Sequence, residues 1–159
     1  MAGKILTIED AVKVSKQART KGRKIILAGG CFDILHLGHI AFLDAAKKQG
    51  DLLFILLESD ENVRNKKGKG RPVNPQEDRS IVLSVLPSVD YIVPLRGMTK
   101  NDEYDKLIVQ IKPDVIAMTK GEPGFEQRKR QASMVGAKVK LVIARVKEKS
   151  TTGLINKNG

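Results

Sequence analysis

Apolar residues gather in five short runs along the chain, and the stretches between the runs mix apolar and polar positions with a helical period. The runs are nearly continuous and rich in branched side chains, as is typical of strands buried on both faces of a parallel sheet. They predict strands at 24–29, 51–58, 89–93, 114–118 and 138–144. The intervening stretches predict helices near 8–21, 37–49, 74–86, 102–112 and 124–136.

Strand and helix alternate along the chain, which predicts an α/β fold. We expect a five-stranded parallel sheet with helices on both faces and right-handed crossovers. The chain has 159 residues, and it shows neither an internal repeat nor a domain-scale linker, so a single domain over 1–159 is expected. Thr7 is the predicted N-cap of the first helix, with Asp10 in the third helical position.

Three loops carry glycine or proline at places where a ligand would bind. Ligands of open parallel sheets bind beyond the carboxyl ends of the strands. GGCFD at 29–33 and KGEPG at 120–124 each follow a predicted strand, so both are expected on one side of the molecule. NKKGKGRPVNP at 65–75 combines chain breakers with several positive charges and is predicted to be a mobile basic loop.

The chain is strongly basic. Its formal net charge is +11, and residues 120–159 hold ten Lys and Arg against three Glu. Such a charge attracts polyanions, which include nucleotides, sugar phosphates and nucleic acids. Two Tyr and four Phe are the only aromatic side chains, and they form no obvious base-stacking platform, so nucleic acid is an unfavoured partner.

Cysteine usage and hydropathy bear on the compartment. Cys31 is the only cysteine, so an internal disulfide is excluded. No apolar run approaches the roughly 20 residues that cross a bilayer. The first residues, MAGKILTIED, lack a secretory pattern. These features predict a cytoplasmic protein that does not act at a membrane.

The segment that bears most directly on function follows the first predicted strand. GGCFD at 29–33 leads to His36-Leu37-Gly38-His39, which opens a helix. Glycines let the backbone approach a phosphate, and a helix N-terminus adds N–H donors and a positive dipole end. Two histidines three residues apart share one helix face and could each donate to a phosphate oxygen. Alone they could equally be a surface pair, but the chain has no further histidine for a His-rich metal site.

Two other segments have capping patterns. Asn74 is expected to cap a helix that Pro75 begins, with Arg79 one turn further on. Hydroxyl residues at 150–152 precede a short apolar stretch and could cap a last helix. Each segment also has a plainer interpretation, namely a solvated helix face for Arg79 and an ordinary cap for the hydroxyl residues.

GGCFDILHLGH at 29–39 resembles the signature of the cytidylyltransferase-like nucleotidyltransferases, whose shared element is His-x-Gly-His. The resemblance covers nearly the entire chain and is greatest to the sugar-phosphate adenylyltransferase domain of bacterial heptose synthesis. The other matching stretches are ILTIED at 5–10, SD at 59–60, GKGRPVNPQEDR at 68–79, VDYIV at 89–93 and STTGLI at 150–155.

The resemblance implies a Rossmann-like nucleotidyltransferase fold and a specific reaction. A phosphate oxygen of the acceptor, expected to be a sugar phosphate, attacks the α-phosphorus of a nucleoside triphosphate, with ATP favoured, and pyrophosphate leaves. A phosphate monoester has a second pKa of about 6 and is already ionised at neutral pH, so no general base is required. Mg²⁺ is expected to arrive on the nucleotide, without a dedicated protein site.

The resemblance also implies roles for individual residues. The side chains expected to act in catalysis are His36, His39, Lys69 and Arg79. The residues expected to bind the nucleotide are Gly30, Cys31, Phe32, Asp33, His36, Gly38, His39, Lys66, Lys120, Arg145, Ser150, Thr151 and Thr152. Which of Lys66, Lys67 and Lys69 reaches the triphosphate stays open.

Several positions depart from the heptose pattern. The chain has Ala28-Gly29 where those enzymes usually carry Thr-Asn, Glu122-Pro123 where they carry Gly-Asp, and Lys149 where they carry an apolar residue or cysteine. Arg145 matches the glycerol-phosphate cytidylyltransferases instead. The alternatives are therefore a CTP-dependent glycerol-phosphate-type enzyme, an FAD-forming adenylyltransferase, or a basic nucleotide- or RNA-binding protein without turnover. A homodimer is compatible with the resemblance.

Overall fold

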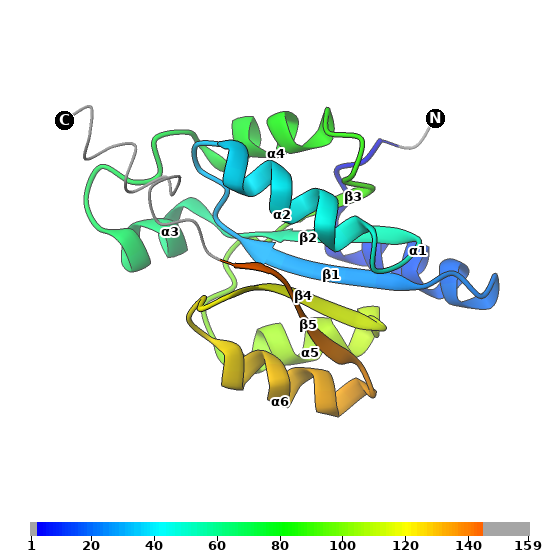
Figure 1. The fold of residues 1–159 in the computed structure, drawn as a ribbon. Helices are drawn as coiled ribbons and strands as arrows, with labels where there is room; N and C mark the ends of the chain where they lie inside the picture. The colour runs from blue at the N-terminus through cyan, green and yellow to red at the C-terminus, as the bar shows by residue number, and fades with distance from the viewer. Residues whose placement is uncertain (1–2, 145–159) are drawn as a thin grey trace.

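The computed structural model describes residues 3–144 and confirms the alternation of strand and helix (Figure 1). The strands are β1 (Ile25–Gly30), β2 (Leu52–Leu57), β3 (Tyr91–Pro94), β4 (Val115–Lys120) and β5 (Lys138–Ala144). The helices are α1 (Ile8–Thr20), α2 (Leu37–Lys47), α3 (Asp60–Lys67), α4 (Gln76–Ser84), α5 (Asn101–Ile111) and α6 (Phe125–Val135).

The five strands form one parallel sheet in the order β3-β2-β1-β4-β5. Alternate residues of β1 enter different cores: Ile25 and Leu27 pack on one face, while Ile26 and Ala28 pack on the other. Helices α2 and α4 lie on one side of the sheet, and α5 and α6 lie on the other (Figure 1). The predicted α/β class, with helices on both faces, is therefore confirmed.

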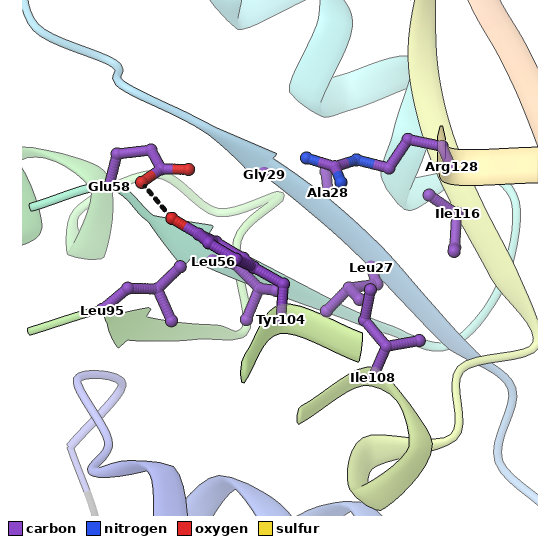
Figure 2. A pocket seen from close by; sticks show the side chains of 10 residues that line it. All are labelled: Leu27, Ala28, Gly29, Leu56, Glu58, Leu95, Tyr104, Ile108, Ile116 and Arg128. Carbon is purple, nitrogen blue, oxygen red and sulfur yellow. Dashed lines mark hydrogen bonds between the residues drawn. The ribbon is translucent and has the colours of Figure 1, made fainter. Parts of the chain in front are cut away.

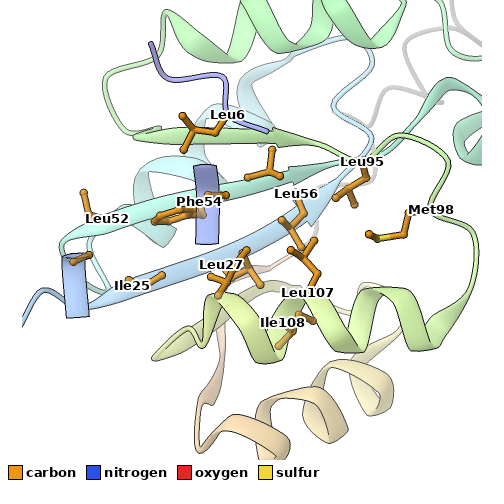
Figure 3. Packing of buried hydrophobic residues seen from close by; sticks show 14 residues of the cluster. Leu6, Ile25, Leu27, Leu52, Phe54, Leu56, Leu95, Met98, Leu107 and Ile108 are labelled. Carbon is orange, nitrogen blue, oxygen red and sulfur yellow. The ribbon is translucent and has the colours of Figure 1, made fainter. Parts of the chain in front are cut away.

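The core on the α5 side is built from side chains of several elements far apart in sequence. Figure 3 shows Leu27 of β1 and Leu56 of β2 packed against Leu107 and Ile108 of α5, with Leu95 closing the end where the strands stop. All of these side chains are buried. This end of the core therefore lies against the edge of the sheet at which ligands of parallel sheets bind.

The order of the strands reverses between β1 and β4, which are neighbours in the sheet although β2, β3 and the helices α2 to α5 separate them in sequence. Such a switch point opens a crevice beyond the carboxyl ends of the strands. Paired residues between β1 and β4 are Ile26–Val115 and Leu27–Ile116, whereas β1 pairs with β2 as far as Gly30. Beyond Leu27 the two central strands are no longer paired, which leaves room between them.

Helix α3 was not predicted, and the expectation of a mobile basic loop over 65–75 is wrong in its first part. Ser59 caps α3 by accepting a 3.1 Å hydrogen bond from the backbone N–H of Asn62. Acidic residues fill the first turn and basic residues the last, which suits the helix dipole. Only Asn62 and Val63 of this helix are buried, so its apolar periodicity is too weak to be recognised in the sequence.

The two predicted helix caps have different outcomes. Thr7 is the N-cap of α1 and accepts a 3.1 Å hydrogen bond from the N–H of Asp10, as expected. Pro75, and not Asn74, occupies the N-cap position of α4, with no side-chain cap hydrogen bond. The amide of Asn74 instead donates to the backbone oxygen of Asp33 at 2.9 Å, because the loop before α4 folds onto the loop after β1. None of the helices among residues 3–144 is long and apolar enough to span a membrane.

Candidate active site

The two histidines form a reciprocal cap at the start of α2. His36 is the N-cap residue, and its Nδ1 accepts from the N–H of Gly38 at 3.0 Å. The N–H of His36 donates in turn to Nδ1 of His39 at 3.3 Å. The imidazole rings lie 3.9 Å apart at an interplanar angle of 31°. The structure thus brings together the pair that the sequence predicted, and the backbone of the helix N-terminus orients both rings.

These hydrogen bonds determine the tautomers. Because each Nδ1 accepts from a backbone N–H, a neutral ring carries its proton on Nε2. Burial, followed by the positive charge of His36 when protonated and that of Lys67, lowers the pKa of His39 to about 4. His39 is therefore neutral at pH 7. It can donate a hydrogen bond through Nε2 to a phosphate oxygen, but it brings no charge of its own.

The loop between β1 and α2 is tightly packed under the histidines. Phe32 has a positive φ of 46°, and its ring centroid lies 5.4 Å from that of His39. A Cβ at Gly30 would lie 2.9 Å from the Phe32 ring, closer than real side chains come, so any larger residue would force that ring to shift. Burial raises the pKa of the Cys31 thiol, although Lys67 and Lys66 oppose this effect. The thiol is thus protonated at neutral pH and is no nucleophile.

Asp33 holds the 71–74 segment against this loop. Its carboxylate accepts from Nε of Arg71 at 2.8 Å and from the N–H groups of Val73 at 2.8 Å and Asn74 at 2.9 Å. Burial disfavours the charged form, but these hydrogen bonds outweigh burial and lower the pKa of Asp33. The side chain of Asp33 is fully enclosed. Its carboxylate therefore orients the loop, and its expected contact with the nucleotide stays a prediction.

Arg79 is a second buried residue that joins separate segments beneath the loop after β1. The residue is 1% exposed. Its three side-chain nitrogens donate to backbone oxygens of Cys31 (2.7 Å), Glu58 (3.0 Å) and Asn74 (2.9 Å) and to Oδ1 of Asp60 (2.6 Å). The guanidinium thus joins the ends of β1 and β2 to the segment before α4. Because every nitrogen is bonded within the protein, Arg79 supports the site from behind.

Three basic side chains lie at the end of α3 and in the turn after it. Lys66 and Lys67 end that helix, and Lys69 lies in the exposed turn after it. Lys66 pairs with Oε1 of Glu58 at 3.2 Å and remains 58% exposed. Lys67 acts electrostatically on both Cys31 and His39. Of the three lysines left open by the sequence, Lys67 is the one whose charge contributes to lowering the pKa of His39.

The remaining predicted residues lie at other loops or beyond the described chain. Lys120 ends β4 and is exposed. After it, the Glu122 carboxylate accepts from the N–H of Thr119 at 3.1 Å, which shapes the turn. The positions that lie outside the described residues are Arg145, Lys149, Ser150, Thr151 and Thr152.

A pocket that the sequence did not reveal opens at the switch point (Figure 2). It is a small, partly open hollow, and its walls come from β1, β2, β4, α5 and α6, with Leu95 after β3. Leu27 and Gly29 of β1 form one wall, and Glu58, Tyr104 and Arg128 supply the polar groups. The sequence carries no signal for this pocket, because its lining residues come from six segments that are far apart along the chain.

Glu58 is the centre of the pocket's polar wall. It is 5% exposed and accepts from Asn62 Nδ2 at 3.0 Å and from the Tyr104 hydroxyl at 2.8 Å, besides its pair with Lys66. Burial and the neighbouring Glu58 carboxylate raise the pKa of Tyr104, so its hydroxyl stays protonated. Within residues 3–144, no group of three or more His, Cys, Asp or Glu side chains could hold a metal ion.

The fold and this site define the class of protein. A parallel α/β sheet carries a glycine-containing loop and a histidine-capped helix N-terminus at its ligand-binding edge, which is an arrangement suited to nucleotide phosphates. A family model described as cytidylyltransferase-like matches residues 27–155. The chain belongs to the cytidylyltransferase-like family, as its sequence motifs predicted.

Individual relatives agree with this assignment. The chain is 42% identical over 154 residues to the bifunctional protein HldE of Wolinella succinogenes and 37% identical over 153 residues to HldE of Nitratiruptor sp.. These alignments cover 97% and 96% of this chain but only 31% of each relative. The chain thus spans about a third of the length of these curated relatives.

Two solved structures share the fold. The lipopolysaccharide core biosynthesis protein of Thermoplasma volcanium superposes with a TM-score of 0.62 at 30% identity, over 79% of this chain and 97% of that protein. Pantoate-beta-alanine ligase of Francisella tularensis superposes with a TM-score of 0.66 over 99% of this chain and 77% of that protein. The second similarity has 15% identity and shows the fold alone.

Proposed function

We propose that the protein is a nucleotidyltransferase that joins an NMP group from ATP to the phosphate of a sugar phosphate and releases pyrophosphate. The observation that carries the proposal is the histidine pair, whose rings are oriented by backbone hydrogen bonds beside the loop after β1. Membership of the family supports the reaction type. The similarity to HldE and to a lipopolysaccharide core biosynthesis protein supports a sugar phosphate as acceptor and, through the heptose adenylyltransferase pattern, ATP as donor.

The chemistry follows from positioning and charge stabilisation. An ionised oxygen of the acceptor phosphate forms a bond to the α-phosphorus, and the bond from that phosphorus to the oxygen bridging the α- and β-phosphates breaks. The electron pair leaves with pyrophosphate, and no general base takes part. His36 and His39 donate hydrogen bonds to oxygens on which charge develops, and the N–H groups near Cys31 and Phe32 hold the α-phosphate.

The electrostatics of the site favour an anionic ligand. Nη2 of Arg71 is buried and has no hydrogen-bond partner in the described part of the chain, which is costly unless an anion or water satisfies it. Lys66, Lys67 and Lys69 add positive charge along the same side. Exposed lysines of this kind neutralise a triphosphate by their charge and do not need one fixed side-chain conformation. Lys120 would add a further positive charge from the loop after β4.

Magnesium fits the proposal as an ion carried by the nucleotide. The described residues offer no cluster of carboxylates for a dedicated site. Mg²⁺ keeps several waters and commonly binds through substrate phosphates, where it would neutralise the pyrophosphate leaving group. The lysines and histidines described above would then bind the remaining phosphate oxygens.

A pyrophosphate-release assay tests the proposed function. The protein is incubated with Mg²⁺ and either ATP or CTP across mannose 1-phosphate, glycerol 3-phosphate and FMN. Release with ATP and the sugar phosphate supports the proposal. Preference for CTP with glycerol 3-phosphate, or for ATP with FMN, would replace it by another reaction of the same family. Binding of ATP without release under any acceptor would indicate a nucleotide-binding protein without turnover.

A further inference from the structure

We propose that Asn62 is a positioning residue for the nucleotide. Its amide joins a buried hydrogen-bonded cluster that fixes α3 against the body of the protein, and α3 in turn holds Lys66 and Lys67 in place for the triphosphate. The inference rests on the proposed function, because the triphosphate is the group whose charge these lysines meet. Asn62 acts through the two lysines, and it needs no contact of its own with the nucleotide.

The cluster is built around the amide nitrogen of Asn62. This Nδ2 lies 2.6 Å from the backbone oxygen of Met98, 2.8 Å from the Tyr104 hydroxyl and 3.0 Å from Oε2 of Glu58. An amide nitrogen has two hydrogens, and the two shortest contacts use both of them. The Tyr104 hydroxyl then donates to Oε2 of Glu58 at 2.8 Å (Figure 2). One side chain of α3 is thus tied to the end of β2, to the segment after β3 and to α5.

Asn62 is the second of two polar anchors that attach α3. The first is Asp60, which accepts from Nη2 of Arg79 at 2.6 Å and from the N–H of Gln76 at 2.8 Å, and it fixes the start of the helix. Only Asn62 and Val63 of the helix are buried. A short helix that is held at its start can still rotate about its axis, so the buried amide at the second position determines that rotation.

The rotation of α3 decides where its last turn directs the two lysines. Side chains four residues apart share a face of a helix, so Lys66 follows Asn62 and Lys67 follows Val63. Nζ of Lys66 pairs with Oε1 of Glu58 at 3.2 Å, which is the other oxygen of the carboxylate that closes the cluster. Lys66 is therefore held by the same group of side chains that holds the helix.

Lys67 shows that the placement of α3 matters at the histidine loop. Its positive charge acts on Cys31 and on His39, and both lysines are exposed to an incoming ligand. Long exposed side chains lose conformational entropy when they bind a ligand. A helix that is already fixed in position lowers this cost, because the lysines begin their approach from the correct place.

Two pairs of variants test the proposal in the full chain. Asn62→Leu removes the amide at nearly constant volume, and the Tyr104 hydroxyl can still donate to Glu58. Its control is Asn65→Leu, the same change at an exposed position of the same helix. Tyr104→Phe removes the hydroxyl from the cluster, and its control is Tyr91→Phe on β3. Thermal unfolding establishes which variants are folded.

We expect Asn62→Leu to raise the KM for ATP about threefold or more, while kcat and the KM for mannose 1-phosphate stay within about twofold. The pKa of His39, followed by NMR titration, should rise toward its value in Lys67→Gln, because the lysine is no longer held near the ring. In the double variant, Asn62→Leu should leave this pKa where Lys67→Gln alone has placed it. Tyr104→Phe should act in the same direction, and both controls should resemble the wild type.

The outcomes separate this inference from the proposed function. If the KM for ATP or the pKa of His39 does not move in folded Asn62→Leu, the cluster serves the fold alone and the proposal is overturned. A rise in the pKa of His39 that persists in full beside Lys67→Gln would overturn it too. If Asn62→Leu does not fold, Tyr104→Phe decides by the same criteria.

A wild-type protein that releases no pyrophosphate with any acceptor would overturn the proposed function instead. In that case the Kd for ATP, measured by calorimetry, replaces the KM, and the pKa of His39 is measured as before. A weaker Kd together with a raised pKa in Asn62→Leu supports the positioning role, and either value unchanged contradicts it.

Discussion

The residues nearest the proposed chemistry are held by two buried charged groups. Asp33 and Arg79 use their hydrogen-bonding groups within the protein, and together they join the loop after β1 to the segment before α4. The string GGCFDILHLGH was sufficient to predict the histidine pair, because the spacing His-x-x-His sets both rings on one helical turn. The role of Arg79 was not predictable, because its acceptors come from three separate segments of the chain.

Replacing Arg79 should destabilise the fold instead of weakening nucleotide binding alone. Lysine keeps the charge but cannot donate to four separated oxygens, so Arg79→Lys leaves buried acceptors unsatisfied. We expect a loss of about 2 kcal/mol or more in the free energy of unfolding, measured by urea denaturation. Arg64→Lys on the exposed side of α3 is the matched control and should change little. Equal stabilities of the two variants would contradict the role assigned to Arg79.

His39 gives the protein a defined pH dependence. Its pKa of about 4 in the fold lies below the ordinary value of 6.5, so between these limits the unfolded chain takes up a proton that the folded protein does not. Stability should therefore fall as the pH drops from 7 to 4.5, with about 2 kcal/mol of the loss due to this residue. Urea denaturation across this range should show a smaller loss for His39→Asn. A variant with the same pH dependence as the wild type would show that His39 is not the titrating group.

At the scale of elements, five strands and five helices were recognised from periodicity alone. Helix α3 was missed because it is polar on most of its surface and its sequence overlaps a stretch rich in glycine and proline. The last turn of this helix carries Lys66 and Lys67, whose positive charges act on Cys31 in the loop that precedes the histidines. The helix starts two residues after Glu58, which lines the pocket.

Lys67 is the residue through which α3 acts on His39. Its positive charge lowers the pKa of His39, so Lys67→Gln should raise that pKa. It should also raise the KM for ATP several-fold, by about 1 kcal/mol of lost attraction, with a smaller effect on kcat. NMR titration of the His39 ring measures the pKa, with Lys21→Gln at the far end of α1 as the control. A His39 pKa that does not move would rule out the electrostatic contact.

At the scale of the whole molecule, the class of fold was predictable and the pocket at the switch point was not. Alternating strands and helices limit the chain to a parallel sheet with helices on both faces. The pocket depends on where β1 and β4 stop pairing, which no local pattern encodes. Gly29 is one of the departures from the heptose pattern, and it lines that pocket. The structure therefore locates this departure at the switch point of the sheet.

The central claim is that the histidine pair promotes transfer of a nucleotidyl group to a phosphate. Its most direct test is the turnover of wild type and His39→Ala with ATP, Mg²⁺ and mannose 1-phosphate, following pyrophosphate and the nucleotide-linked product together. The account predicts equal amounts of the two products and a turnover about 100-fold lower in the folded variant, because one transition-state donor is lost. A folded His39→Ala protein with near-wild-type turnover, or pyrophosphate formed without the linked product, would contradict the account.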